Sequence, residues 1–151
     1  MGFDSIYTSP YADHMKTQLL YPVAFYVFYI FCLAIYMFKV RVRALKKREV
    51  AYKYFQTYSG ESPHEKTLVV GRHFDNQFQA PMLFFLVSTL MIAFDKGSVL
   101  TVVLAWLFVF TRLIHSYIHL GTNHLTKRVV AYSAGWLVLL FMLGTLVIEL
   151  I

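Results

Sequence analysis

Four long apolar runs constrain this chain more than any other feature. They lie at residues 19–38, 78–94, 99–118 and 129–151. Each is close to the roughly twenty residues that a helix needs to cross about 30 Å of hydrocarbon. Arg112 and Glu149 are the only Asp, Glu, Lys or Arg residues within them. Because a helix of a soluble bundle needs a polar face for water, the runs predict an all-α integral membrane protein with four transmembrane helices.

Composition supports this class and excludes others. Hydrophobic residues make up 58% of the 151 residues and charged residues only 15%, whereas soluble domains carry about 25% charged residues. The length fits a single membrane domain over residues 1–151. A single cysteine, Cys32, excludes a disulfide within one chain. The net charge of +6 resides mostly between the apolar runs, so it predicts membrane topology and lipid contact rather than nucleic-acid binding.

The basic residues also predict an orientation. Residues 39–77 carry nine Lys and Arg against four acids, and Lys127 and Arg128 follow the third apolar run. The opposite side of the membrane would hold only Lys16 and Lys96. By the positive-inside rule, the 39–77 loop is expected in the cytoplasm and both termini on the non-cytoplasmic side.

Polar stripes run along two of the expected helices. Residues spaced by three or four positions share one face of a helix, and polar groups inside a membrane helix are costly enough to mark a functional site. The first stripe leads into the second helix and the second lies on the third helix. The two stripes are Arg72, Asn76 and Gln79, and Arg112, His115 and His119.

A tight turn at residues 95–98 places the two stripes at one depth. Antiparallel helices joined by a short turn bring residues equally far from the turn to the same level. At 1.5 Å per residue, Arg112 is expected about 20 Å from the outer turn, in the cytoplasmic third of the bilayer. This counting does not fix the rotation of either helix. The pairs matched in depth are Gln79 with Arg112, Asn76 with His115, and Arg72 with His119.

Two interpretations of these residues remain open from the pattern alone. In one, the polar groups only stabilise the packing of the helices: Arg112 hydrogen-bonds to Gln79 and to helix carbonyls, and Asn76 bridges the helices. In the other, Arg112 and neighbouring arginines form a pocket for an anion, because guanidinium groups bind carboxylates through paired hydrogen bonds. His115 and His119 have the spacing of a helical metal pair, but the sequence shows no third ligand, so no metal site is predicted.

At these residues the chain resembles the MAPEG family, the membrane-associated proteins in eicosanoid and glutathione metabolism. The resemblance extends from about Leu20 to the end. Residues 71–81 (GRHFDNQFQAP) resemble the family's Arg-x-x-x-Asn-x-x-Glu motif before a proline in helix two, and residues 111–120 (TRLIHSYIHL) resemble its Arg-x-x-His segment in helix three. The chain most resembles bacterial members of uncertain function, which implies a bacterial inner membrane.

The resemblance implies a homotrimer of four-helix protomers with glutathione bound between protomers near the cytoplasmic face. Arg72, Asn76 and Arg112 would hold the tripeptide, and Arg128 lies where glutathione-using members polarise the thiol. The candidate glutathione-binding residues are Arg72, Asn76, Gln79, Arg112 and His115. The candidate catalytic residues are Arg112, Arg128 and His119.

Two departures from the family pattern leave two functions open. Gln79 replaces the glutamate of the motif, and His119 stands where glutathione-using members commonly carry tyrosine. One hypothesis is a glutathione-dependent transferase or peroxidase that acts on lipophilic electrophiles. The alternative is a non-catalytic membrane subunit that binds lipid or another membrane protein complex through the basic, aromatic segment 39–58.

Overall fold

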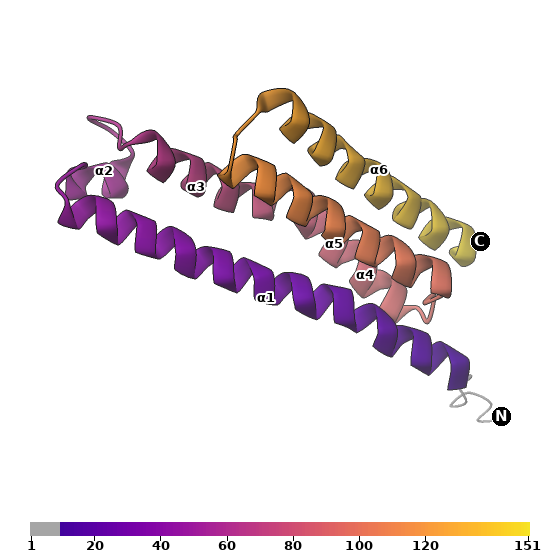
Figure 1. Ribbon diagram of the computed structural model, residues 1–151. Coiled ribbons are helices and arrows are strands. Elements are labelled where there is room, and N and C mark those ends of the chain that lie inside the picture. The colour runs from indigo at the N-terminus through magenta and orange to yellow at the C-terminus, as the bar shows by residue number, and fades with distance from the viewer. Residues whose placement is uncertain (1–9) are drawn as a thin grey trace.

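The structure is a computed structural model that describes residues 10–151, and within that range it is entirely helical (Figure 1). Four of its helical stretches are long and apolar enough to cross a membrane, which supports the integral membrane fold expected from the sequence. Those stretches are His14–Lys46, Glu65–Ala93, Val99–Leu120 and Leu125–Leu150. The helices are α1 (Pro10–Lys46), α2 (Tyr52–Thr57), α3 (Glu65–Asp75), the 3₁₀ turn η1 (Asn76–Phe78), α4 (Ala80–Ala93), α5 (Val99–Leu120) and α6 (Leu125–Leu150).

The long helices run side by side, with α1 and α6 flanking α4 and α5 (Figure 1). The start of α1, the α4–α5 turn and the C-terminus lie toward one end of the bundle. The α1–α2 and α5–α6 connections lie toward the other end, where the basic residues gather. This alternation is the arrangement that four successive membrane crossings produce.

The helices extend beyond the apolar runs from which they were predicted. Helix α1 contains Pro22 without ending there and continues to Lys46, with Arg43 and Lys46 in a last turn that favours positive charge. Much of the expected loop 39–77 is therefore helical, as the end of α1, α2 and α3. Helix α2 ends at Thr57, and Gly60, in the segment that leads to α3, adopts a φ of 99° that suits glycine.

The second crossing is interrupted just before the membrane-embedded part of α4. Pro81 lies in the first turn of α4 and has no N–H to donate to the carbonyl of Gln77, which favours a helix start at this point. The chain passes instead through the 3₁₀ turn, and Gln79 takes a non-helical conformation with φ −106° and ψ −110°. The interruption separates the stripe of polar residues on α3 from the apolar α4.

The predicted tight turn between the second and third crossings is present. Asp95 has a φ of 59°, and Ser98 caps α5: its Oγ accepts a hydrogen bond from the N–H of Thr101 at 3.3 Å. Farther along, Phe84 of α4 stacks on Phe108 of α5 with ring centroids 4.5 Å apart. Because these two residues are almost equally far from the turn, their contact supports the depth matching used above.

The core lies where α1, α4, α5 and α6 meet. Tyr26 is fully buried and contacts the stacked pair Phe84 and Phe108 edge-on, with centroids 6.2 Å and 6.1 Å away. Other large apolar side chains point outward, including Phe28 at 65% exposure and Phe31 at 66%. Such a surface suits lipid or a second subunit rather than water.

Candidate functional site

Arg112 is a fully buried cation at the centre of the protomer. Its side chain is 1% exposed, and none of its three guanidinium nitrogens makes a hydrogen bond of good geometry among the described residues, although the Tyr26 hydroxyl lies near enough to interact with it. Its guanidinium carbon lies 5.3 Å from the centre of the Tyr132 ring, which gives a cation–π contact. A buried charge left without hydrogen-bonding partners is strongly destabilising. The protomer alone therefore does not complete the environment of this side chain.

The packing of α6 against α5 holds Arg112 in place. A Cβ on Gly135 would lie 3.1 Å from Thr111 Oγ1, which is a tight contact, and 3.6 Å from Arg112 Cδ, which is ordinary van der Waals contact. By contrast, Gly144 has nothing within 4 Å of a built Cβ. Of the two glycines of α6, Gly135 is therefore the one that brings α6 close to α5 beside Arg112.

The structure contradicts the interpretation in which Gln79 hydrogen-bonds to Arg112. Gln79 Oε1 instead accepts a hydrogen bond from the Tyr132 hydroxyl at 3.2 Å, and the guanidinium remains unpaired. Tyr132 thus lies between the two groups that the sequence placed together. The interpretation in which Arg112 only stabilises helix packing therefore lacks the Arg112–Gln79 hydrogen bond that it predicted.

The two predicted stripes differ in where they face. On α5, Arg112, His115 and His119 are all buried, at 1%, 2% and 3% exposure, so this stripe faces the protomer interior. Arg72 and Gln79 are exposed and Asn76 is half-buried, so the other stripe faces away from the interior. The two stripes share a depth but do not meet within one protomer. The candidate glutathione-binding residues therefore form two sets. The inner set is Arg112 and His115, and the outer set is Arg72, Asn76 and Gln79.

Two residues that the sequence interpretation missed, His73 and Gln77, meet the α5 stripe instead. Gln77 Oε1 accepts a hydrogen bond from the Tyr26 hydroxyl at 2.6 Å, and Gln77 Nε2 donates to the backbone carbonyl of His73 at 2.8 Å. The Tyr29 hydroxyl lies 3.4 Å from His73 Nε2. These contacts attach the turn before α4 to α1. The same depth counting applied to His73 would have placed it level with the α5 histidines.

His73 is the third imidazole that the sequence did not reveal. One ring nitrogen from each of His73, His115 and His119 lies within 4.8 Å of the other two, and all three residues are buried. The ring centroids of His73 are 5.8 Å from His115 and 5.0 Å from His119. The expectation that the pair on α5 has no third partner was wrong.

Arg128, at the start of α6, lies beside the C-terminal end of the α5 stripe. Its Nη1 donates to Asn123 Oδ1 at 2.7 Å and lies 3.5 Å from His119 Nε2. Its backbone carbonyl accepts from His115 Nδ1 at 3.2 Å. Helix α5 ends at Leu120, so Asn123 does not continue the stripe as part of the helix, but its side chain still reaches the site.

A cavity of about 390 Å³ opens next to this cluster. It lies between the start of α3 and the α5–α6 loop, and its lining includes His64, Lys66, His119 and Asn123. His119 is the residue of the three-histidine cluster that this cavity reaches. The cavity therefore gives access from the basic end of the bundle to His119.

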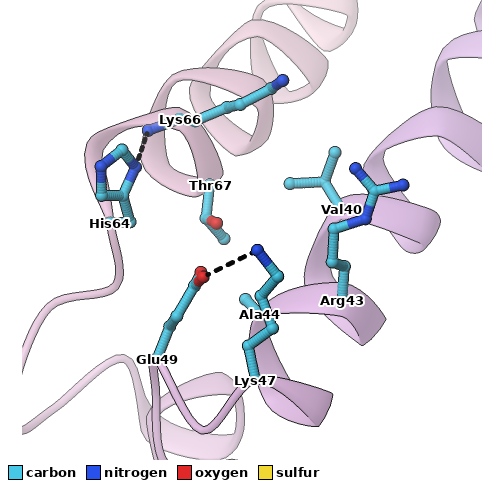
Figure 2. Close-up of a pocket in the computed structure, with 8 residues that line it drawn as sticks. All are labelled: Val40, Arg43, Ala44, Lys47, Glu49, His64, Lys66 and Thr67. Atoms are coloured by element: carbon cyan, nitrogen blue, oxygen red, sulfur yellow. Dashed lines mark hydrogen bonds and ion pairs between the residues drawn. The ribbon is translucent and has the colours of Figure 1, made fainter.

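A second cavity, of about 340 Å³, is lined by basic side chains at the end of α1 (Figure 2). We call it the basic cleft; its charged residues are Arg43, Lys47, Glu49 and Lys66. Lys47 and Glu49 point toward one another across it and form an ion pair at 3.7 Å. With one acid against three bases, the cleft retains positive charge.

Comparison with known proteins gives one family match. A family model described as the MAPEG family matches residues 19–148, which include both polar stripes, the three histidines and Arg128. No curated protein and no solved structure matches the chain.

Proposed function

Because the chain belongs to the MAPEG family, we propose that it is a membrane-embedded, glutathione-dependent transferase or peroxidase acting on lipophilic electrophiles. Members of the family generally use glutathione and are generally trimers. The observation that carries the proposal is the Arg112 guanidinium, which is 1% exposed and makes no hydrogen bond of good geometry among the described residues.

The unpaired guanidinium supports an anionic ligand. Arginine binds a carboxylate through two parallel, charge-assisted hydrogen bonds, and such bonds are roughly twice as strong as neutral ones. Glutathione carries two carboxylates and can supply a third negative charge as its thiolate. Bound beside Arg112, one of these groups would satisfy nitrogens that otherwise destabilise the fold.

The outward-facing stripe supports a site shared between protomers. Arg72 and Gln79 are exposed on the surface of a single protomer, and Asn76 is half-buried. In a homotrimer, these residues would lie against the next copy of the chain, where they would hold the tripeptide's carboxylates and amides. Arg112 and His115 are buried inside their own protomer, so the ligand would extend from this interface into the protomer to reach them.

In the proposed chemistry, positive charge stabilises the glutathione thiolate. Arg128 and Arg112 would lower the pKa of the thiol through their nearby charge, and His119 lies beside Arg128 to orient it or accept a proton. In a transferase, the sulfur forms a bond to carbon while the leaving group departs with its bonding electrons. In a peroxidase, the sulfur attacks a peroxide oxygen, the O–O bond breaks, and a second glutathione completes the disulfide.

The membrane arrangement suits a lipophilic second substrate. The exposed surfaces of the long helices are apolar, so an electrophile dissolved in lipid reaches the bundle without entering water. The basic end of the bundle would face the cytoplasm, where glutathione is abundant, with both termini on the other side. A bacterial inner membrane fits this topology.

The direct test is glutathione-dependent turnover by the purified oligomer in mild detergent. We expect conjugation of an activated aryl halide or reduction of a lipid hydroperoxide, with kcat about a hundredfold lower in Arg128→Ala, as for the loss of one charge-stabilising donor. Lys127→Ala, which removes the neighbouring exposed cation, is the matched control and should keep its activity. An intact, folded oligomer that neither binds glutathione nor turns over either substrate would overturn the proposal.

The basic cleft favours a second candidate function, a non-catalytic subunit that binds anionic lipid. Arg43, Lys47 and Lys66 surround a concave site at the end of α1, where a phospholipid headgroup would lie (Figure 2). Each basic residue near an anionic membrane surface contributes about 1 kcal/mol of attraction. The glutamine at position 79 and the histidine at 119 fit a site that no longer performs glutathione chemistry.

Reconstitution into lipid nanodiscs separates this candidate from the first. Anionic lipid should raise the unfolding temperature relative to zwitterionic lipid, and the double variant Arg43→Ala/Lys47→Ala should lose most of that difference. Lys96→Ala, at the opposite end of the bundle, should retain it. An equal response of all three proteins to anionic lipid would eliminate the basic cleft as a lipid site.

A further inference from the structure

The three-histidine cluster has a chemistry that the glutathione site does not require. His73, from α3, and His115 and His119, from successive turns of α5, bring three ring nitrogens within 4.8 Å of one another. The residues are 0%, 2% and 3% exposed, so water does not surround the rings. Imidazole nitrogen is the commonest metal ligand that proteins use at neutral pH.

Each histidine of the cluster has one ring nitrogen that is buried and unpartnered. These atoms are His73 Nδ1, His115 Nε2 and His119 Nδ1. An unpaired buried polar atom costs about 1–3 kcal/mol. Because the same three side chains also bring one ring nitrogen each within 4.8 Å of the others, a ligand shared by all three would satisfy them.

The opposite ring nitrogens have the supporting contacts that metal-binding histidines show. The carbonyl of Arg128 only accepts, so His115 must donate to it from Nδ1, at 3.2 Å, and this tautomer leaves the lone pair of Nε2 free. His73 Nε2 lies 3.4 Å from the Tyr29 hydroxyl and 3.3 Å from the Gln77 amide nitrogen, which only donates. A metal at His73 Nδ1 therefore requires Nε2–H to donate to Tyr29, with the Gln77 amide keeping its 2.8 Å bond to the His73 carbonyl. A metal-ligating histidine typically donates its other N–H to a carbonyl or another polar group in this way.

We propose that His73, His115 and His119 bind a first-row divalent transition metal, with zinc as the reference ion, and that an anion occupies its fourth coordination position. Three protein ligands with one open position is the arrangement of catalytic rather than structural zinc sites. Zn–N bonds of about 2.0–2.1 Å in tetrahedral geometry separate the nitrogens by roughly 3.3 Å. Each ring must therefore shift by about 1 Å, a change within the reach of side-chain torsions.

Nearby positive charge explains why an anion completes the site. Arg112 is three residues before His115 on the same face of α5, and Arg128 Nη1 lies 3.5 Å from His119 Nε2. The metal would displace this long contact, while the 2.7 Å bond to Asn123 keeps Arg128 near. Two guanidinium groups repel a bare dication but attract the hydroxide, carboxylate or thiolate bound to it. The same charges therefore favour the metal–anion pair over the metal alone.

The structure also contains an entry path. The 390 Å³ cavity beside the α5–α6 loop is lined by His119 and by Asn123, and it opens at the basic end of the bundle. An ion that enters this cavity would meet His119 first, and the other two histidines lie directly behind it in the cluster. A buried cluster without such access would have to acquire its metal during folding.

The test is calorimetric titration of Zn²⁺ into tag-free, chelator-treated protein in mild detergent, repeated with Co²⁺ to read its ligand-field absorption. We expect one ion per protomer and, with Co²⁺, the intense visible bands of a tetrahedral site. His73→Phe, His115→Phe and His119→Phe keep a ring in each position, and each should weaken binding at least about tenfold. His124→Phe, an exposed histidine at the start of α6, is the matched control and should bind like the wild type.

Size-exclusion profiles of the variants establish that each remains an intact oligomer. Absence of zinc binding by the intact wild-type protein would overturn the proposal, as would binding that persists in the double variant His73→Phe/His115→Phe. If the Phe variants instead raise the unfolding temperature and zinc has no effect on the wild type, the three rings only fill the core. None of these readings depends on glutathione, so the result stands apart from the proposed enzymatic function.

Discussion

Replacement of Arg112 by methionine should stabilise the ligand-free protein. Methionine has a similar length and keeps the contact with Gly135, but it removes a guanidinium that is 1% exposed and lacks hydrogen bonds of good geometry among residues 10–151. An uncompensated buried charge costs about 3–5 kcal/mol. The cation–π contact with Tyr132, at 5.3 Å, offsets about 2 kcal/mol of this cost.

The difference leaves a net gain of about 1–3 kcal/mol for Arg112→Met, from these two opposing effects. For a domain of this size, that gain corresponds to a rise of about 2–10 °C in unfolding temperature. The assay is thermal unfolding of the detergent-solubilised oligomer, without glutathione or metal. Arg43→Met removes an exposed arginine and should stay within about 0.5 kcal/mol of the wild type.

A lower unfolding temperature for Arg112→Met, with Arg43→Met unchanged, would refute the reasoning. It would mean that Arg112 already has hydrogen-bond partners in the assembled protein. The arginine would then stabilise helix packing rather than bind a ligand. The stability of a single variant therefore separates the two interpretations that the sequence left open.

Two further predictions concern the scaffold around the site. Tyr26→Phe leaves Gln77 Oε1 without the donor that now lies 2.6 Å away, so the free energy of unfolding in detergent should fall by about 1–2 kcal/mol. Tyr21→Phe, at an exposed tyrosine, should leave it unchanged, and equal effects of the two substitutions would contradict the hydrogen bond's role. Gly144→Ala should gain about 0.5–1 kcal/mol because alanine favours helix, whereas Gly135→Ala should lose that gain through its 3.1 Å contact with Thr111 Oγ1; equal unfolding temperatures would show that α6 yields without strain.

The sequence predicted the depth of the site's residues better than the direction in which they face. Depth follows from counting away from the 95–98 turn, and the Phe84–Phe108 stack shows that the counting works. The direction in which each side chain of the second crossing faces depends on where its helix is interrupted. The interruption lies at η1 and Gln79, just before Pro81 and α4. The polar residues that reach α5 are consequently His73 and Gln77 instead of the outward-facing stripe.

The helix lengths show a related limit. Hydropathy locates the apolar part of each crossing, but backbone hydrogen bonding continues past it where the sequence still favours helix, as in α1 up to Lys46.

The third imidazole was missed for a different reason. His73 is next to Arg72 in sequence but lies about 100° around α3 from it, on the buried side of the helix. Only the packing of α3 against α5 brings it to His115 and His119.

Glutathione titration by calorimetry, into the purified oligomer and into Arg112→Ala, tests the central claim most directly. The account predicts binding to the wild type with a Kd of about 1 mM or tighter, which corresponds to about 4 kcal/mol. Loss of two charge-assisted hydrogen bonds should weaken binding by the variant about a hundredfold or more. Absence of binding by an intact wild-type oligomer, or equal binding by both proteins, would contradict a glutathione site built around Arg112.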